Sequence, residues 1–129
     1  MPPSESLYPP DWLRVAEEDF QRIEGRLALN DPADAGLHLQ QAVEKFLKTF
    51  LLSRGWRLRR IHDLAILLDE ALMYEPSLVG YRPACQTVTA FYFAERHPFT
   101  IQMHPAEQDV RVALGQLQGL IDFVRRSVR

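Results

Sequence analysis

The stretch Leu39-Gln-Gln-Ala-Val-Glu-Lys-Phe-Leu-Lys-Thr-Phe-Leu51 places apolar residues three or four positions apart, which is the period of an α-helix. Four of them form one stripe and three widen it: Leu39, Val43, Phe46 and Phe50, then Ala42, Leu47 and Leu51. A helix that covers a core from one side needs only a narrower stripe. We therefore expect a central helix that contacts several neighbours, over about residues 33–54, with Gly55 as its stop.

Helices are also predicted before and after this central helix in the sequence. The first begins near Asp11, a residue type that caps helix N-termini, and Asn30-Asp31-Pro32 ends it. A short third helix covers about residues 63–74, where leucines recur at helical spacing.

The fourth predicted helix contains a proline in its interior. It begins with Pro76 in its first turn and ends at Arg96-His-Pro98, since proline disfavours helix at the preceding residue. Pro83 predicts either a kink or a later start. A fifth helix begins at Pro105. Because no segment alternates with a period of two, we predict an all-α fold, an up-and-down antiparallel bundle of four long helices and one short helix.

Composition fits one domain of 129 residues, with 47% apolar and 25% charged residues. The net charge of −2 excludes binding of nucleic acid by bulk charge, so any such site must be a local patch. Cys85 is the only cysteine, which excludes an internal disulfide and a Cys-rich zinc site; we expect no metal site and no cofactor. Four prolines predict a flexible leader over residues 1–10, followed by the bundle over residues 11–129.

Hydropathy gives no indication of a membrane. The longest apolar runs, such as 64–68, have about five residues, far fewer than a bilayer-spanning helix needs. The first residues lack the features of a secretion signal, and we expect a cytoplasmic protein without membrane contact.

The polar face of the central helix offers a first candidate site. Gln41, Lys45 and Lys48 lie on one side of it, and Gln40, Glu44 and Lys48 are spaced four apart. These two lysines are the only ones in the chain, against thirteen arginines. The alternative interpretation is a solvated face with a Glu44–Lys48 pair.

A basic connector follows the central helix and offers a second candidate site. It holds four arginines in seven residues, with an indole between them: Arg54, Arg57, Arg59, Arg60 and Trp56. Guanidinium groups bind phosphate and indoles stack on bases, so the connector predicts a nucleotide or RNA contact. The alternative is a solvated loop that pairs with carboxylates of neighbouring helices.

His62-Asp63 follows the basic connector directly, and Asp63 is suited to cap the third helix.

Arginine with histidine is the smallest set of residues for metal-free RNA cleavage. The imidazole acts as general acid or base, and the guanidinium stabilises the phosphorane-like charge. The catalytic candidates are therefore Arg96 with His104, or Arg57 with His62.

Several motifs together resemble the HEPN domain. His38-Leu-Gln-Gln-Ala-Val-Glu-Lys-Phe-Leu-Lys48 is similar to the second-helix signature of that family. Asp11-Trp-Leu-x-x-Ala16 followed by Asp19, and Ile61-His-Asp-Leu64, resemble the starts of its first and third helices. Arg96-His-Pro98 resembles the Arg-Tyr-Pro that closes its fourth helix, and the resemblance spans about residues 11–125.

This resemblance implies a helical bundle that forms homodimers, in a stand-alone bacterial or archaeal protein. It implies a partner too, a small nucleotidyltransferase, in a toxin–antitoxin module. Many HEPN domains are metal-independent RNases with an Arg-x4–6-His motif near the fourth helix. Here seven residues separate Arg96 from His104, one too many, whereas four separate Arg57 from His62, but in the connector.

These departures favour the non-catalytic branch of the family. We expect a module that binds a nucleotide, RNA or a partner protein in a cationic groove. The binding candidates are Gln41, Lys45, Lys48, Arg59, Arg60, His62, Asp63 and Arg96. Glu44, His62 and Asp63 are alternatively a buried polar network that fixes helix packing.

Two other interpretations stay open. One is a metal-independent endoribonuclease that uses the arginine–histidine pairs above. The other is a structural adaptor, because the aromatic residues near the end of the fourth helix cannot all face one core. These residues are Phe91, Tyr92, Phe93 and Phe99.

Overall fold

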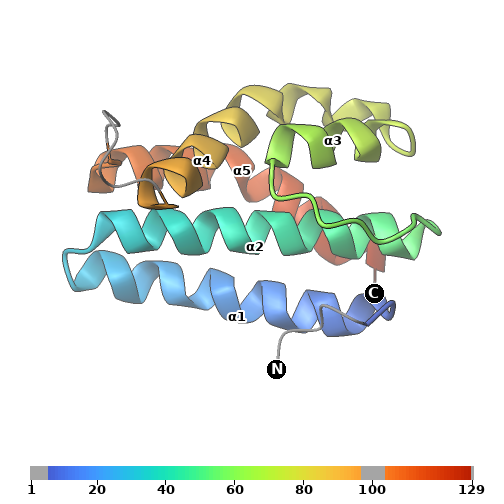
Figure 1. Cartoon of the computed structure of the whole chain (residues 1–129), viewed down its shortest axis with the longest axis horizontal. Helices are drawn as coiled ribbons and strands as arrows, with labels where there is room; N and C mark the ends of the chain where they lie inside the picture. Colours follow the sequence, from blue (N-terminus) through green and yellow to red (C-terminus); the bar gives the residue numbers. More distant parts are fainter. Residues whose placement is uncertain (1–5, 97–103, 129) are drawn as a thin grey trace.

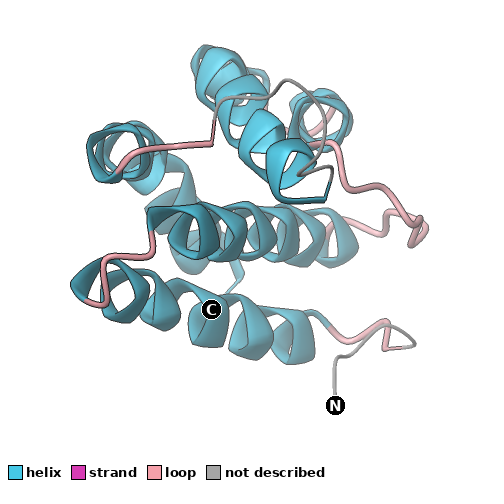
Figure 2. Cartoon of the chain, turned by 60° about the vertical axis from the view of Figure 1, so that its left-hand side comes forward, coloured by secondary structure: helices cyan, strands magenta, loops and turns pink. Residues whose placement is uncertain are grey.

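A central helix with neighbours on both sides organises the fold, which the computed structural model describes for residues 6–96 and 104–128 (Figures 1 and 2). The elements are α1 (Pro9–Ala28), α2 (Pro32–Ser53), α3 (Leu64–Leu72), the 3₁₀ turn η1 (Pro76–Tyr81), α4 (Arg82–Arg96) and α5 (Glu107–Val128). No strand occurs among these residues. The predicted all-α bundle of four long helices and one short helix is confirmed.

Helix α2 is the central element, as its wide apolar stripe predicted. It contacts α1, α3, α4 and α5, and α1 and α4 lie on opposite sides of it (Figures 1 and 2). At Gly36 the neighbouring elements approach closely, because an added Cβ there would lie 3.2 Å from Phe91 and 3.2 Å from Pro105. The phenylalanines Phe46 and Phe50 are among its fully buried side chains.

The starts of the first two helices follow proline chemistry. α1 begins at Pro9, so the expected start near Asp11 was wrong by less than one turn. Pro9 and Pro10 occupy the first turn of the helix, where the backbone N–H groups have no partner within the helix and a proline is tolerated. Asp11 instead accepts a hydrogen bond from the Ser6 hydroxyl at 2.7 Å. α2 begins after Asp31, whose carboxylate accepts from the Asp34 N–H at 3.2 Å. Gly55, with φ of +85°, follows its end as predicted.

The later helix starts were also readable from the sequence. Asp63 caps α3, since its carboxylate accepts from the N–H groups of Ala65 and Ile66 at 2.9 and 3.1 Å. Of the two alternatives for the fourth helix, the later start is correct: η1 precedes α4, and Pro83 lies in the first turn of α4. α5 begins two residues after Pro105.

Cys85 and the aromatic residues of α4 differ in their burial. Cys85 is buried, and this burial raises the pKa of its thiol to about 12. The nearby Arg82 opposes the rise, and Asp63 adds a smaller contribution to it. Phe91 is buried while Phe93 is 45% exposed, so these aromatics do not share one core, as expected. Phe99 lies outside the described residues.

None of the described helices is long and apolar enough to cross a membrane.

Gly25 in α1 provides a simple test of the helix assignment. Nothing lies within 4 Å of a Cβ added there, and glycine in a helix interior is less favourable than alanine by about 0.5–1 kcal/mol. We expect Gly25→Ala to raise the free energy of unfolding by about that amount in urea denaturation followed by circular dichroism. Gly55→Ala, at the positive φ, should lower it instead. A Gly25→Ala protein that is less stable than wild type would contradict the assignment.

Candidate functional site

A buried carboxylate, Glu44, is the centre of the candidate site. It comes from the middle of α2 and is 8% exposed. Its oxygens contact three groups: Gln40 Nε2 at 3.1 Å, Lys48 Nζ at 3.0 Å and His62 Nδ1 at 3.0 Å. Because a buried charge needs partners, this network compensates both the carboxylate and the Lys48 ammonium, which is 4% exposed.

The same network attaches the end of the basic connector to α2. Gln40 Nε2 also donates to the backbone carbonyl of His62 at 2.9 Å. The next residue, Asp63, caps α3, and the Leu64 N–H donates to Thr89 Oγ1 of α4 at 3.0 Å. The position of His62 is thereby fixed by α2, α3 and α4 together.

His62 presents its imidazole to solvent. Its side chain is 57% exposed although Nδ1 bonds a buried carboxylate. The ring stacks on Tyr92 of α4, with centroids 5.9 Å apart and planes inclined by 23°. A carboxylate on one ring nitrogen orients an imidazole and leaves the other nitrogen to face a ligand.

Lys48 connects the site to α1. Its Nζ lies 5.6 Å from the centroid of the Trp12 ring, a cation–π distance. Trp12 is itself held by a hydrogen bond from Nε1 to the Ser6 carbonyl at 2.9 Å. The pair of Glu44 and Lys48 that the sequence indicates does form, but the face that carries it is buried, not solvated, because α1 and the connector cover it.

A second polar cluster lies between α1 and α2 around Asp19, which is 3% exposed. Lys45 Nζ bonds its carboxylate, and Arg22 and His38 lie at 3.4 Å. The other ring nitrogen of His38 lies 3.4 Å from Asp34. Lys45 therefore uses its amine to join two helices, and it belongs to this cluster and not to that of Glu44.

The arginines of the connector alternate with residues that pack on the core. Trp56 and Ile61 pack against the core, and Arg57 is exposed between them. Arg59 forms an ion pair with Glu70 of α3. The guanidinium of Arg54 stacks over the Phe50 ring at 4.9 Å. Part of the expected pairing with neighbouring carboxylates is thus present.

The structure brings together only some of the residues predicted for the site. Lys48 and His62 meet at Glu44, with Asp63 next in the chain, whereas Lys45 contacts α1 and Arg59 contacts α3. Of the remaining candidates, Gln41 is partly buried, Arg60 and His104 are exposed, and Arg96 ends α4 one turn after Tyr92. His97 and Pro98 lie outside the described residues. Glu44 and His62 form part of the polar network considered as an alternative, with the carboxylate buried and the imidazole exposed, whereas Asp63 caps α3.

Three participants were not predicted as site residues: Gln40, Trp12 and Tyr92. The spacing of Gln40, Glu44 and Lys48 placed Gln40 on the right face but gave no sign of its bond to His62. Tyr92 could not be paired with His62 without the tertiary structure. In the described part of the chain, no three or more His, Cys, Asp or Glu residues are grouped as metal ligands.

Comparisons with known proteins agree with the fold. A family model for the HEPN domain matches residues 10–127. The chain is similar to the protein in the crystal structure of TT1696 from Thermus thermophilus, with 25% sequence identity and a TM-score of 0.75, over 98% of this chain and 99% of that one. No curated protein matches the chain.

Proposed function

The chain belongs to the HEPN domain family, and from this premise we propose that it is a non-catalytic module that binds nucleotides, free or within RNA, at His62. The observation that carries the proposal is an exposed imidazole, stacked on Tyr92 and held by the buried carboxylate of Glu44. A binding side chain needs to be held in place by the residues behind it, and Glu44 holds His62 in this way.

The chemistry around His62 suits a base next to a phosphate. An imidazole and a phenol ring offer stacking surfaces, and base stacking contributes roughly 1–3 kcal/mol per base. Arg57 lies five residues before His62 in the sequence and is exposed, so its guanidinium is our candidate for binding the phosphate. Because the chain has a net charge of −2, binding of an anion requires a local positive charge, which the arginines of the basic connector supply.

Calorimetric titration with ATP and with a short single-stranded RNA tests the proposal. We expect wild type to bind at least one of them, and His62→Ala and Arg57→Ala to weaken binding by about 10-fold or more. Arg14→Ala is the matched control, since Arg14 is an exposed arginine of α1, and it should bind as wild type does. The proposal fails if wild type binds neither ligand or if His62→Ala binds unchanged.

One observation favours a second candidate function, a metal-independent endoribonuclease. Glu44 at Nδ1 orients His62 as carboxylates orient catalytic histidines, and Arg57 stands at Arg-x4-His spacing from it. Cleavage of RNA in EDTA that is lost in His62→Ala would support it. Loss in His104→Ala instead would assign the chemistry to Arg96 and His104, and cleavage that persists in both variants would exclude both histidines.

We also propose the partnership that the family suggests, with a small nucleotidyltransferase in a toxin–antitoxin module. The match of residues 10–127 to the HEPN family model supports it. Co-expression with a nucleotidyltransferase from the same gene neighbourhood, followed by co-purification, is the direct test, and separate elution of the two proteins would contradict it.

A further inference from the structure

The hydrogen bond between His62 and Glu44 determines which ring nitrogen carries the proton. Glu44 is buried, and its second oxygen bonds the Lys48 ammonium at 3.0 Å. A carboxylate that is paired with an ammonium is ionised and can only accept hydrogen bonds. His62 Nδ1, which lies 3.0 Å from the first oxygen, is therefore the protonated nitrogen. In the neutral ring, Nε2 then carries the lone pair.

Nε2 is the polar atom of the ring that His62 offers to a ligand. Of the two ring nitrogens, only Nδ1 is hydrogen-bonded within the part of the chain that the structure describes. One face of the ring lies against Tyr92, and 57% of the side chain is exposed. Gln40 Nε2 bonds the His62 backbone carbonyl at 2.9 Å, so both the backbone and the Nδ1 edge of the ring are held. The site thus presents one hydrogen-bond acceptor in a defined position.

A fixed acceptor distinguishes bases that carry an exocyclic amine from bases that carry a carbonyl at the same position. Adenine and cytosine have an amine beside a ring nitrogen, and this amine can donate to an imidazole nitrogen. Hypoxanthine and uracil have a carbonyl oxygen there, so two lone pairs would face each other. The neighbouring ring N–H of these bases is flanked by that oxygen, which weakens its approach to an acceptor. A polar group left unpaired in a binding site lowers the affinity.

We propose that the site selects nucleotides whose base is adenine or cytosine, because the exocyclic amine of the base donates a hydrogen bond to His62 Nε2. This inference rests on the proposed nucleotide binding at His62 and adds the class of base. Glu44 and Gln40 are positioning residues, since they set the tautomer and the place of the ring from behind it. Lys48 keeps the Glu44 carboxylate ionised.

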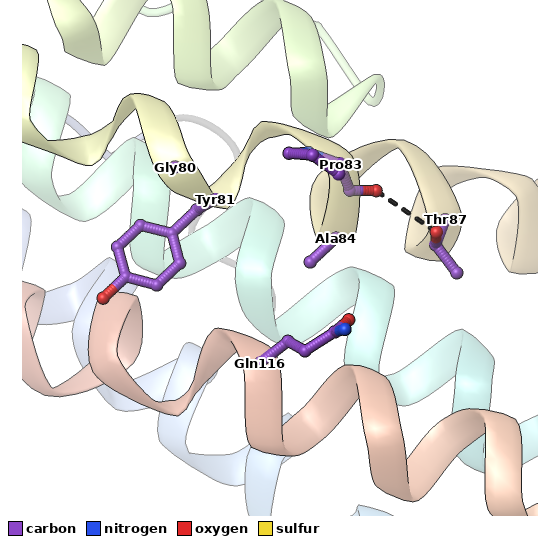
Figure 3. Close-up of a pocket in the computed structure, with 6 residues that line it drawn as sticks. All are labelled: Gly80, Tyr81, Pro83, Ala84, Thr87 and Gln116. Carbon is purple, nitrogen blue, oxygen red and sulfur yellow. Dashed lines mark hydrogen bonds between the residues drawn. The ribbon is translucent and has the colours of Figure 1, made fainter.

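A base bound in the groove between α4 and α5 would not be selected in this way. That groove, of about 390 Å³, is lined by Tyr81 and Gln116 among others, and Gln116 reaches from α5 toward Ala84 (Figure 3). The hydroxyl of tyrosine and the amide of glutamine both donate and accept hydrogen bonds, so they pair with an amine or with a carbonyl. Gln116→Ala is therefore the matched control, because it removes a polar side chain from a groove that His62 does not line.

Nuclear magnetic resonance tests the tautomer without any ligand. The four histidines are labelled with nitrogen-15, and His62→Phe identifies the signals of His62 by their loss. At about pH 8.5, where imidazoles are generally uncharged, Nδ1 of His62 should be protonated and Nε2 unprotonated. A proton on Nε2 in place of Nδ1 would overturn the inference, whatever the nucleotide affinities are.

Calorimetric titration with two pairs of nucleotides tests the preference for the base. ATP differs from ITP, and CTP from UTP, by an amine in place of a carbonyl. At about pH 8.5 we expect wild type to bind ATP and CTP about 10-fold more tightly than ITP and UTP. His62→Phe keeps an aromatic ring and leaves Glu44 bonded to Lys48 and Gln40, so it should bind the two members of each pair within about two-fold of each other. Gln116→Ala should keep the preference of wild type.

The outcomes separate this inference from the proposed function. Equal affinities within each pair overturn the base preference and leave binding at His62 standing. A preference that persists in His62→Phe, or that is lost in Gln116→Ala, belongs to another group and also overturns the inference. A wild type that binds none of the four nucleotides removes the proposed function and the preference together. Because the preference is a ratio measured within one protein, partial unfolding of a variant leaves it unchanged.

Discussion

Replacing Glu44 by alanine should lower the free energy of unfolding by about 3–5 kcal/mol. The substitution leaves the ammonium of Lys48, a residue that is 4% exposed, without its carboxylate, and it removes one of the two acceptors of Gln40 and the partner of the His62 ring. An uncompensated buried charge is among the most destabilising changes in a folded protein. Urea denaturation followed by circular dichroism measures the loss.

Two further variants separate charge burial from other causes. Glu24→Ala removes a carboxylate that is 64% exposed and pairs with Arg111, and it should change stability by less than about 0.5 kcal/mol. The double variant Glu44→Leu/Lys48→Met should recover much of the loss, because well-packed apolar residues can replace a buried ion pair. A loss below about 1 kcal/mol in Glu44→Ala would contradict the buried network.

The Glu44 variant also shows why the sequence predicted the site only in part. Spacing places Glu44 and Lys48 on the same face of their helix, and charged residues are seldom buried, so a solvated pair was a reasonable alternative. The burial comes from α1 and the connector. The contact of His62 with Glu44 crosses 18 residues of sequence, and that of Lys45 with Asp19 crosses 26, which helical period does not encode.

The fold was easier to predict from the sequence than the site, because the sequence signals that specify its helices are local. The apolar stripe of α2, the cap at Asp63 and the positive-φ glycine at Gly55 act within one or two turns of the chain. The start of α1 was misplaced where two types of signal compete. Pro9 and Pro10 fit a first turn as well as an extended leader, and Asp11 suits a first turn as well as a cap.

Phe46→Ala should be as destabilising as the loss of Glu44, for an apolar reason. Phe46 is fully buried at the centre of α2 and meets Phe20 edge-to-face, with ring centroids 6.3 Å apart. Truncation removes buried surface and leaves a cavity, which together cost about 3–5 kcal/mol. In thermal unfolding this loss should lower Tm by about 10–20 °C.

The position of Arg125 makes this core sensitive to truncation at Phe46. Its guanidinium lies 5.0 Å from the Phe20 ring centroid and 5.6 Å from that of Phe46, and it bonds both oxygens of Glu17 at 2.7 and 2.9 Å. The hydrogen bonds to Glu17 raise the pKa of Arg125. A guanidinium is charged at any accessible pH, so moving it into the apolar cavity would be costly. Leu29→Ala, at a leucine that is 71% exposed, is the control and should change Tm by less than about 3 °C. If Phe46→Ala unfolded at the same temperature as this control, α2 would not be the centre of the core.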